Sequence, residues 1–246
     1  MKDNMIQSVS RAISVIECFD CNAELNFNSI CKKVNLSNGT VFRIINTFLN
    51  RGFIEKNENN KYVLGKKLII LGLQAFNNIE FVKVIHPILV KLANETKETC
   101  NAAIRVDDMF MYVVTIESTY TLKMTVKLGQ LGFLHSSAAG KVLLAFNDEK
   151  SLSELLNKIE LKKFNNNTIT DKNKLLEEIQ NIRKVGYSID NEEEEIGAKC
   201  IGGPIFNNKN ELVGSISISA PNSRFDKNFD KYVIELKKAY KKAFES

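Results

Sequence analysis

Proline and glycine are scarce in this chain of 246 residues, with three and twelve copies respectively. Few backbone breaks are therefore forced, which favours long helices and regular strands over a fold dominated by loops. The chain also lacks any run near the roughly 18 to 20 consecutive apolar residues that span a bilayer. Its polar start, residues 1–4, leads into no signal-peptide core. We therefore expect a cytoplasmic protein of one or two domains without a membrane partner.

The spacing of the cysteines does not indicate a disulfide framework. They are five in number and widely scattered, which fits a reducing compartment better than a set of disulfides. Cys18 and Cys21 form a lone Cys-X-X-Cys pair near Cys31, but no histidine and no second pair lie close enough in sequence to complete a tetrahedral zinc site. We predict no metal and no cofactor. A redox or metal-sensing role for these cysteines, or for Cys100 and Cys200, remains an alternative.

Positive charge gathers in the first quarter of the chain. Of the formal net charge of +5, residues 1–67 contribute +4 and the remaining residues contribute +1. A basic segment attached to a nearly neutral body indicates a polyanionic partner for that segment alone.

The first 65 residues have the pattern of a winged helix-turn-helix. Apolar residues recur at helical spacing in three segments, around 6–19, 27–34 and 38–51. Asn26 and Ser37 suit the N-caps of the second and third segments, and Gly52 suits the C-terminal end of the third. Two strand-like runs, 53–56 and 61–64, follow and predict a β-hairpin.

The third helical segment presents polar side chains opposite its apolar stripe. Arginine can read guanine, asparagine can read adenine, and threonine can contact phosphate or a thymine methyl group. Lysines on the hairpin suit phosphate contacts from a wing. The alternative is an ordinary amphipathic helix with a solvated face, but the helix order, the hairpin and the basic charge favour DNA. The predicted DNA-binding residues are Ser37, Asn38, Thr40, Phe42, Arg43, Asn46, Lys56 and Lys61.

From residue 79 onward, hairpins alternate with helical patterns, which predicts an α+β sensor-like domain joined through a connecting helix over 66–77. The predicted strands cover 99–106, 110–117, 122–128, 187–191, 200–206 and 211–220. The predicted helices cover 79–96, 136–146, 148–159, 171–184 and 225–244.

Small residues open the predicted helix at 136–146. His135 beside Ser136 and Ser137 invites a hydrolase interpretation, but residues adjacent in sequence are rarely a catalytic pair, and no nucleophile elbow is present. We favour a helix N-terminus whose free N–H groups and positive dipole suit an anion. Simple capping with close helix packing is the alternative.

Two further polar patterns lie near the C-terminus. The glutamates at 192–195 predict a solvated turn. Ser215, Ser217 and Ser219 alternate with isoleucines, so that all three face one side of a strand. That side is either an outward polar face or the wall of a polar cavity, and periodicity does not choose between them.

Seven sequence blocks carry a resemblance. They are SRA at 10–12, LSNGTVFR at 36–43, YVLG at 62–65, LHSSAAGK at 134–141, GYSID at 186–190, CIGGPIF at 200–206 and SISISAP at 215–221. In order and spacing the chain resembles the IclR-type bacterial transcriptional regulators over nearly its whole length. Asn38 and Gly39 depart from the basic or hydroxyl residues that the family often has there, so we expect the DNA contacts at this point to differ.

The resemblance implies a winged helix-turn-helix domain at 1–65, a linker helix at 66–78 and a GAF-like effector-binding domain with a curved antiparallel sheet at 79–246. It also implies homodimers, often paired into homotetramers, that respond to small organic metabolites. A carboxylate ligand in characterised members lies near the matching motifs. Carried over to this chain, the effector-binding residues are Ala138, Ala139, Asp190, Cys200, Ser217 and Ser219.

These observations predict a DNA-binding transcriptional regulator without catalytic activity, acting as a repressor on double-stranded operator DNA. The acidic wall that Asp190 would make disfavours ligands with several negative charges. We therefore expect a monocarboxylate effector such as a keto, hydroxy or sugar acid, with an aromatic acid as the second choice. The alternatives are a cysteine-dependent redox or metal sensor, an enzyme using the Cys, His and Ser groups of the C-terminal domain, or an effector domain that serves only for assembly.

Overall fold

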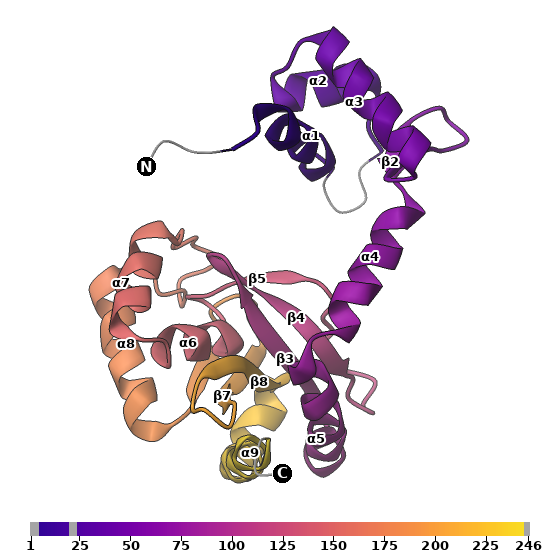
Figure 1. Ribbon diagram of the computed structural model, residues 1–246. Coiled ribbons are helices and arrows are strands. Elements are labelled where there is room, and N and C mark those ends of the chain that lie inside the picture. Colours follow the sequence, from indigo (N-terminus) through magenta and orange to yellow (C-terminus); the bar gives the residue numbers. More distant parts are fainter. Residues whose placement is uncertain (1–4, 20–23, 244–246) are drawn as a thin grey trace. The chain divides into compact units, whose positions relative to one another are not determined.

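The computed structural model describes residues 5–19 and 24–243, and they form two compact units that meet between Ile79 and Glu80. Figure 1 labels most of the helices and strands, which are numbered in chain order. The first unit contains the winged helix-turn-helix and the connecting helix, and the second contains an α+β domain built on an antiparallel sheet. The predicted fold class is confirmed.

The first unit consists of a helical bundle, a β-hairpin and one further helix. The elements are α1 (Gln7–Glu17), α2 (Phe27–Val34), α3 (Asn38–Arg51), β1 (Ile54–Lys56), β2 (Tyr62–Leu64) and α4 (Lys66–Asn77). Side chains from the periodic apolar positions, including Val15, Ile30, Val41 and Ile45, meet in a buried core. Burial of these stripes stabilises helices that would be too short to persist alone in water.

Local capping sets the ends of α2 and α3. Asn26 Oδ1 accepts a hydrogen bond from the Ser29 amide at 2.8 Å and so caps α2. Gly52 ends α3 with a φ of 73°, a left-handed conformation that glycine adopts without steric cost. Ser37 occupies the N-cap of α3 as predicted, but its hydroxyl lies 3.0 Å from Thr40 Oγ1 and makes no cap bond to the backbone.

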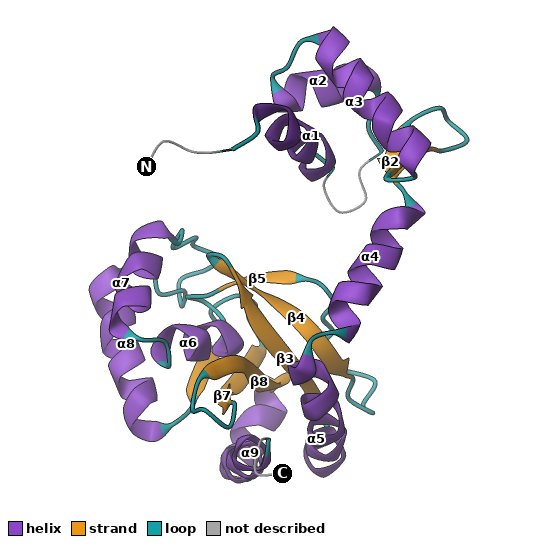
Figure 2. Ribbon diagram, viewed as in Figure 1, coloured by secondary structure: helices purple, strands orange, loops and turns teal. Residues whose placement is uncertain are grey.

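The second unit is organised around a six-stranded antiparallel sheet (Figure 2). Its strands are β3 (Thr99–Val106), β4 (Met109–Ile116), β5 (Leu131–Phe133), β6 (Ser188–Asn191), β7 (Ala198–Phe206) and β8 (Leu212–Pro221). They lie in the order β5-β4-β3-β8-β7-β6. β3 and β8 are therefore central although they are distant in sequence, and β6 is an edge strand.

Helices cover both faces of this sheet. α5 (Glu80–Thr96) and α9 (Asn222–Lys242) pack side by side on one face, and α6 (Ala138–Ala145) packs on the other, where α7 (Glu149–Lys158) and α8 (Lys172–Val185) cover it. Adjacent glycines of β7 show the two faces: a Cβ on Gly202 would meet the Ala138 carbonyl of α6, and a Cβ on Gly203 would meet Tyr240 of α9. Every residue of α6 is buried, which explains its run of small and apolar residues.

One predicted strand is wrong. Residues 122–128 form no strand, and the short strand beside β4 is β5 instead. Leu122 and Leu128 are 69% and 62% exposed, so the apolar alternation in this segment is not matched by a covering layer. The segment is held by two of its carbonyls, since Thr99 Oγ1 donates to the Met124 carbonyl at 2.7 Å and Arg224 donates to that of Leu122 at 2.8 Å.

The helices differ from a membrane span in length and composition. Among the described residues, no single helix is both long and apolar enough to cross a bilayer. α4 and α5 meet those criteria only when they are counted together across the break between them.

Candidate functional site

The N-terminal half of α3 presents the polar face that the sequence predicted. Asn38, Phe42 and Arg43 are exposed, whereas Thr40 and Asn46 are half-buried. Phe42 is 56% exposed, and its ring packs edge-to-face with the Phe27 ring, with centroids 6.4 Å apart. An exposed aromatic ring between two polar side chains can contact a sugar or a base methyl group.

Arg11 joins this surface from a different helix. Together with Arg43 it lines a hollow of about 340 Å³ between α1 and α3. Two guanidinium groups at one hollow make a local positive site that suits a phosphate. Sequence analysis did not assign Arg11 to DNA because helical spacing alone does not show which α1 residues meet α3.

The wing lysines already have partners on the protein surface. Lys56 Nζ lies 5.3 Å from the centre of the Tyr62 ring. Lys61 Nζ lies 3.1 Å from Glu24 Oε2, and these side chains are 47% and 41% exposed. The hydrogen bond from Lys61 lowers the pKa of Glu24. Ion pairs this exposed contribute at most about 1 kcal/mol, so Lys61 can exchange Glu24 for a phosphate.

In the second unit, strand register builds a polar row on the sheet face toward α6. Asp190 of β6 pairs with Cys200 of β7, which pairs with Ser219 of β8. Residues directly opposite in antiparallel strands point to the same face. Ser215, Ser217 and Ser219 are 0%, 2% and 6% exposed, so an outward polar face is wrong for them.

The start of α6 lies over this row. Ser137 Oγ accepts from the Gly140 amide at 3.0 Å, and the Ser137 carbonyl accepts from the Lys141 amide at 2.9 Å. The amides of Ala138 and Ala139 have no hydrogen-bond partner within the part of the chain that the structure describes. Two N–H groups at the positive end of a helix dipole are therefore available to an anion.

Close packing holds that helix start against the sheet. Ser188 Oγ donates to the Ala138 carbonyl at 2.6 Å, and glycine at 202 allows the same carbonyl to approach β7. The Ala139 methyl group belongs to the apolar cluster on this side of the sheet, so only its backbone amide can serve a ligand. Simple capping and anion binding are thus compatible at α6, because Ser137 caps one amide and leaves two others.

The prediction of a solvated turn at the glutamates 192–195 is wrong for Glu193 and Glu194, whereas Glu195 is exposed as predicted. Glu193 is 4% exposed and forms an ion pair with Lys141, which is 1% exposed. Lys141 Nζ also donates to the Ile189 carbonyl and lies 3.4 Å from Glu178 Oε1. The partners Glu193 and Lys141 are 52 residues apart, so a run of four glutamates could not reveal the pairing.

Glu194 also turns inward, where it accepts a hydrogen bond from Ser136 Oγ at 2.6 Å. Burial raises the pKa of Asp190 to about 7 and raises the pKa of Glu194, although the Ser136 bond opposes the second shift. Burial and then the nearby charges of Cys200, Glu194 and Asp190 raise the pKa of Tyr112. Asp190, Glu194, Cys200 and Tyr112 therefore form one electrostatically coupled cluster near the start of α6.

The hydrolase and cysteine interpretations find no supporting geometry here. His135 Nε2 lies 3.0 Å from the Lys162 carbonyl, whereas the Ser136 hydroxyl is bonded to Glu194, so the two do not form a nucleophile–base pair. Burial raises the pKa of the Cys200 thiol, which keeps it in the unreactive protonated form. Cys21 lies outside the described residues.

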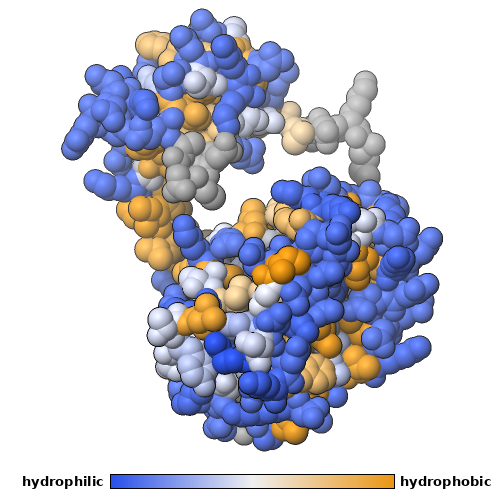
Figure 3. Space-filling model, turned by 180° about the vertical axis from the view of Figure 1, so that it is seen from behind, coloured by the Kyte–Doolittle hydropathy of each residue, from blue (hydrophilic) through white to orange (hydrophobic). Residues whose placement is uncertain are grey.

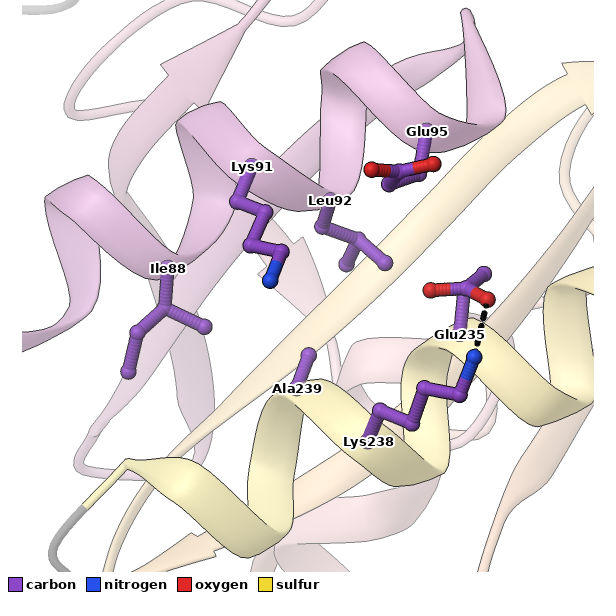
Figure 4. A pocket seen from close by; sticks show the side chains of 7 residues that line it. All are labelled: Ile88, Lys91, Leu92, Glu95, Glu235, Lys238 and Ala239. Atoms are coloured by element: carbon purple, nitrogen blue, oxygen red, sulfur yellow. Dashed lines mark hydrogen bonds and ion pairs between the residues drawn. The ribbon is translucent and has the colours of Figure 1, made fainter.

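A separate groove of about 250 Å³ lies between α5 and α9 (Figure 4). It occupies the sheet face opposite the Asp190–Cys200–Ser219 row. Glu235 and Lys238 of α9 pair with each other at 2.7 Å along its rim. Its lining residues are Ile88, Lys91, Leu92, Glu95, Glu235, Lys238 and Ala239.

The fold and these surfaces define a transcriptional regulator of the winged-helix class. Residues 8–58 match the IclR helix-turn-helix domain, and residues 73–243 match the bacterial transcriptional regulator IclR C-terminal domain. The chain therefore belongs to the IclR family of transcriptional regulators, which are not enzymes, as the resemblance implied.

Known proteins agree with this assignment. The chain is 31% identical to the HTH-type transcriptional regulator KdgR of Escherichia coli over 96% of this chain and 91% of the relative. It is 28% identical to the transcriptional repressor IclR of Escherichia coli over 89% and 81%. Its fold matches an IclR homolog complexed with 4-hydroxybenzoate from Microbacterium hydrocarbonoxydans, with a TM-score of 0.82, 20% identity and coverage of 96% and 97%.

Proposed function

We propose that this regulator is a repressor whose affinity for operator DNA is changed by a small carboxylate-bearing metabolite bound in the second unit. The observation that carries the proposal is that the amides of Ala138 and Ala139 have no hydrogen-bond partner among the described residues and lie over the buried polar row. Repression is supported by the similarity to the transcriptional repressor IclR of Escherichia coli. A carboxylate effector is supported by the IclR homolog of similar fold that is complexed with 4-hydroxybenzoate.

In the proposed effector pocket, the start of α6 would face the carboxylate of the ligand, and the polar row of the sheet would face the rest of the ligand. The helix start of α6 would bind the carboxylate through the amides of Ala138 and Ala139. Asp190 and Ser219 would meet the rest of the ligand from the sheet, together with Cys200 and Ser217. Because Asp190 adds negative charge when ionised, a monocarboxylate is favoured over ligands with several charges. Such a ligand acts only through different affinities for two conformations of the protein.

The carboxylate requirement can be tested with matched neutral analogues. Keto, hydroxy, sugar and aromatic monocarboxylates that bind should raise the melting temperature of the full-length protein, and their primary amides should not. The same carboxylates should change the affinity for an operator selected from a random duplex pool. A library in which no carboxylate raises the melting temperature would contradict the proposed pocket.

The first unit would bind DNA through the exposed face of α3 and through the wing. Arg43, Asn38 and Asn46 would read base edges in the major groove, and Thr40 and Phe42 would add contacts to methyl groups or the backbone. Ser37 at the helix start would contact a phosphate, as would Lys56 and Lys61 on the wing.

We propose that the protein acts as a homodimer or homotetramer. Val9 and Ile13 of α1 are about half-exposed, and Ile69, Ile70 and Leu73 of α4 are 62%, 51% and 56% exposed. Figure 3 shows hydrophobic surface of this kind around α4, which buries none of its own residues. Apolar surface of this extent is suited to pairing between copies. A dimer would place two reading helices about 34 Å apart, or a multiple of it, on two half-sites.

Replacing Arg43 by alanine should weaken operator binding by about 1–3 kcal/mol, because the loss of a bidentate base contact is not compensated. Arg51→Ala is the matched control, since Arg51 is also exposed on α3 but stands at its C-terminal end. Gel shifts at fixed salt would measure both. Equal affinities for the two variants would refute the role of Arg43.

The proposed dimer has a separate test. Sedimentation of the protein as a monomer, both free and bound to DNA, would refute it.

A further inference from the structure

Glu194 occupies a position in the effector pocket that its sequence context does not suggest. Its Oε1 accepts from Ser136, the residue just before the α6 cap, and its charge acts on Asp190, Cys200 and Tyr112. Within the described residues, Oε2 of Glu194 has no hydrogen-bond partner. A second carboxyl group, with one oxygen that has no partner among the described residues, therefore lies close enough to act on Asp190.

A buried amide oxygen adds to the acceptors on the same face. Asn101 of β3 pairs in register with Ser217 and is 1% exposed. Its Nδ2 lies 3.4 Å from Ser219 Oγ, and its Oδ1 has no hydrogen-bond partner within the described part of the chain. A buried acceptor without a partner destabilises the folded state, and a ligand that donates a hydrogen bond to it removes that penalty.

The buried cation Lys141, whose charge acts on Asp190, already has partners. Lys141 is bonded to Glu193 and to the Ile189 carbonyl, and it lies 3.4 Å from Glu178. Neither Glu194 nor Asp190 therefore has an ion-pair partner among the described residues. A ligand must meet them with hydrogen-bond donors and cannot bring a further anionic group close to them.

We infer that Glu194 is a specificity-determining residue of the effector pocket, where it accepts a hydrogen bond from an effector hydroxyl and excludes effectors that carry a second carboxylate. The inference rests on the proposed function, in which the first carboxylate of the ligand binds the amides of α6. It narrows the effector to a monocarboxylate with several hydroxyl groups, because Glu194, Asp190 and Asn101 all present acceptors.

Three six-carbon acids separate the two parts of this inference. Gluconate carries one carboxylate and five hydroxyls, glucarate carries two carboxylates, and hexanoate carries no hydroxyl. Titration calorimetry of the full-length protein would measure each acid against wild type, Glu194→Gln and Glu195→Gln. Glu195 is exposed and adjacent, so it provides the same change of charge outside the pocket.

Wild type should bind gluconate at least about tenfold more tightly than hexanoate or glucarate, as expected for a hydrogen bond to a charged group. Glu194→Gln should weaken gluconate binding and strengthen glucarate binding, and Glu195→Gln should change neither. Opposite changes for the two acids distinguish a specific contact from a general loss of negative charge, which would strengthen both.

The other possible results would contradict either the role of Glu194 or the proposed pocket itself. Equal binding of gluconate and hexanoate, or no effect of Glu194→Gln, overturns the role of Glu194 while the carboxylate pocket stands. A uniform gain for gluconate and glucarate in Glu194→Gln overturns the hydroxyl contact. If none of the three acids binds wild type, the proposed pocket fails and the assignment of Glu194 fails with it.

Discussion

Replacing Lys141 by methionine is expected to destabilise the second unit by about 3–5 kcal/mol, because it leaves Glu193 as a buried carboxylate without its partner. Lys141 is 1% exposed and the Glu193 side chain 5% exposed, so water cannot take over the lost interaction. Denaturant or thermal unfolding followed for the second unit would measure the change, since two units need not unfold in one transition.

Lys238→Met provides the control for this effect. Lys238 is 63% exposed and pairs with Glu235 at 2.7 Å, and exposed pairs contribute at most about 1 kcal/mol. The double variant Lys141→Met, Glu193→Leu should recover much of the lost stability, because it removes both buried charges. Equal destabilisation by Lys141→Met and Lys238→Met would show that the buried pair does not stabilise the unit.

Replacing Asp190 by asparagine is expected to stabilise the effector-free protein above neutral pH. Burial raises the pKa of Asp190 from its ordinary value of 3.8 to about 7, so the folded state binds this proton more tightly than the unfolded state does. The side chain therefore lowers stability progressively as the pH rises from about 4 through 7. By linkage the gain from the substitution has an upper bound on the order of 4 kcal/mol at pH 8.

The pH dependence separates this cause from a change in packing. Asparagine keeps an oxygen that can accept from the Glu193 amide, which lies 2.8 Å from Asp190 Oδ1. The difference in melting temperature between Asp190→Asn and wild type should therefore be small at pH 4.5 and grow toward pH 8.5. A difference that stays constant over this range would contradict a titration of Asp190. The charged groups that act on it are Glu193, Lys141 and Glu194.

Elements with strong apolar periodicity were predictable from sequence because one face of each is buried. The segment 38–51 agrees with α3 in the structure, whose Val41 and Ile45 are buried. The predicted strand at 122–128 failed for the same physical reason, since its alternating apolar side chains have no layer to cover them. Periodicity shows where an apolar face can form, but at residues 122–128 the apolar side chains Leu122 and Leu128 stay exposed and no strand forms.

The candidate effector site was also predictable from the sequence only in part. The blocks around Ala138, Asp190 and Ser219 were identified in the sequence, and the strand register then placed Asp190 and Ser219 in one row. That the serines face inward toward α6 was decided by the tertiary structure, because alternation alone gives two equivalent faces.

Local sequence patterns were enough to predict the helix ends at Asn26 and Gly52, because each end depends on neighbours within a few positions. Glu193 pairs with Lys141 and Glu194 accepts a hydrogen bond from Ser136 only because tertiary folding brings these distant positions together. A glutamate run is hydrophilic whether it is solvated or buried. Whether such a glutamate is buried depends on partners that folding brings from distant positions in the sequence, and a local pattern does not reveal those partners.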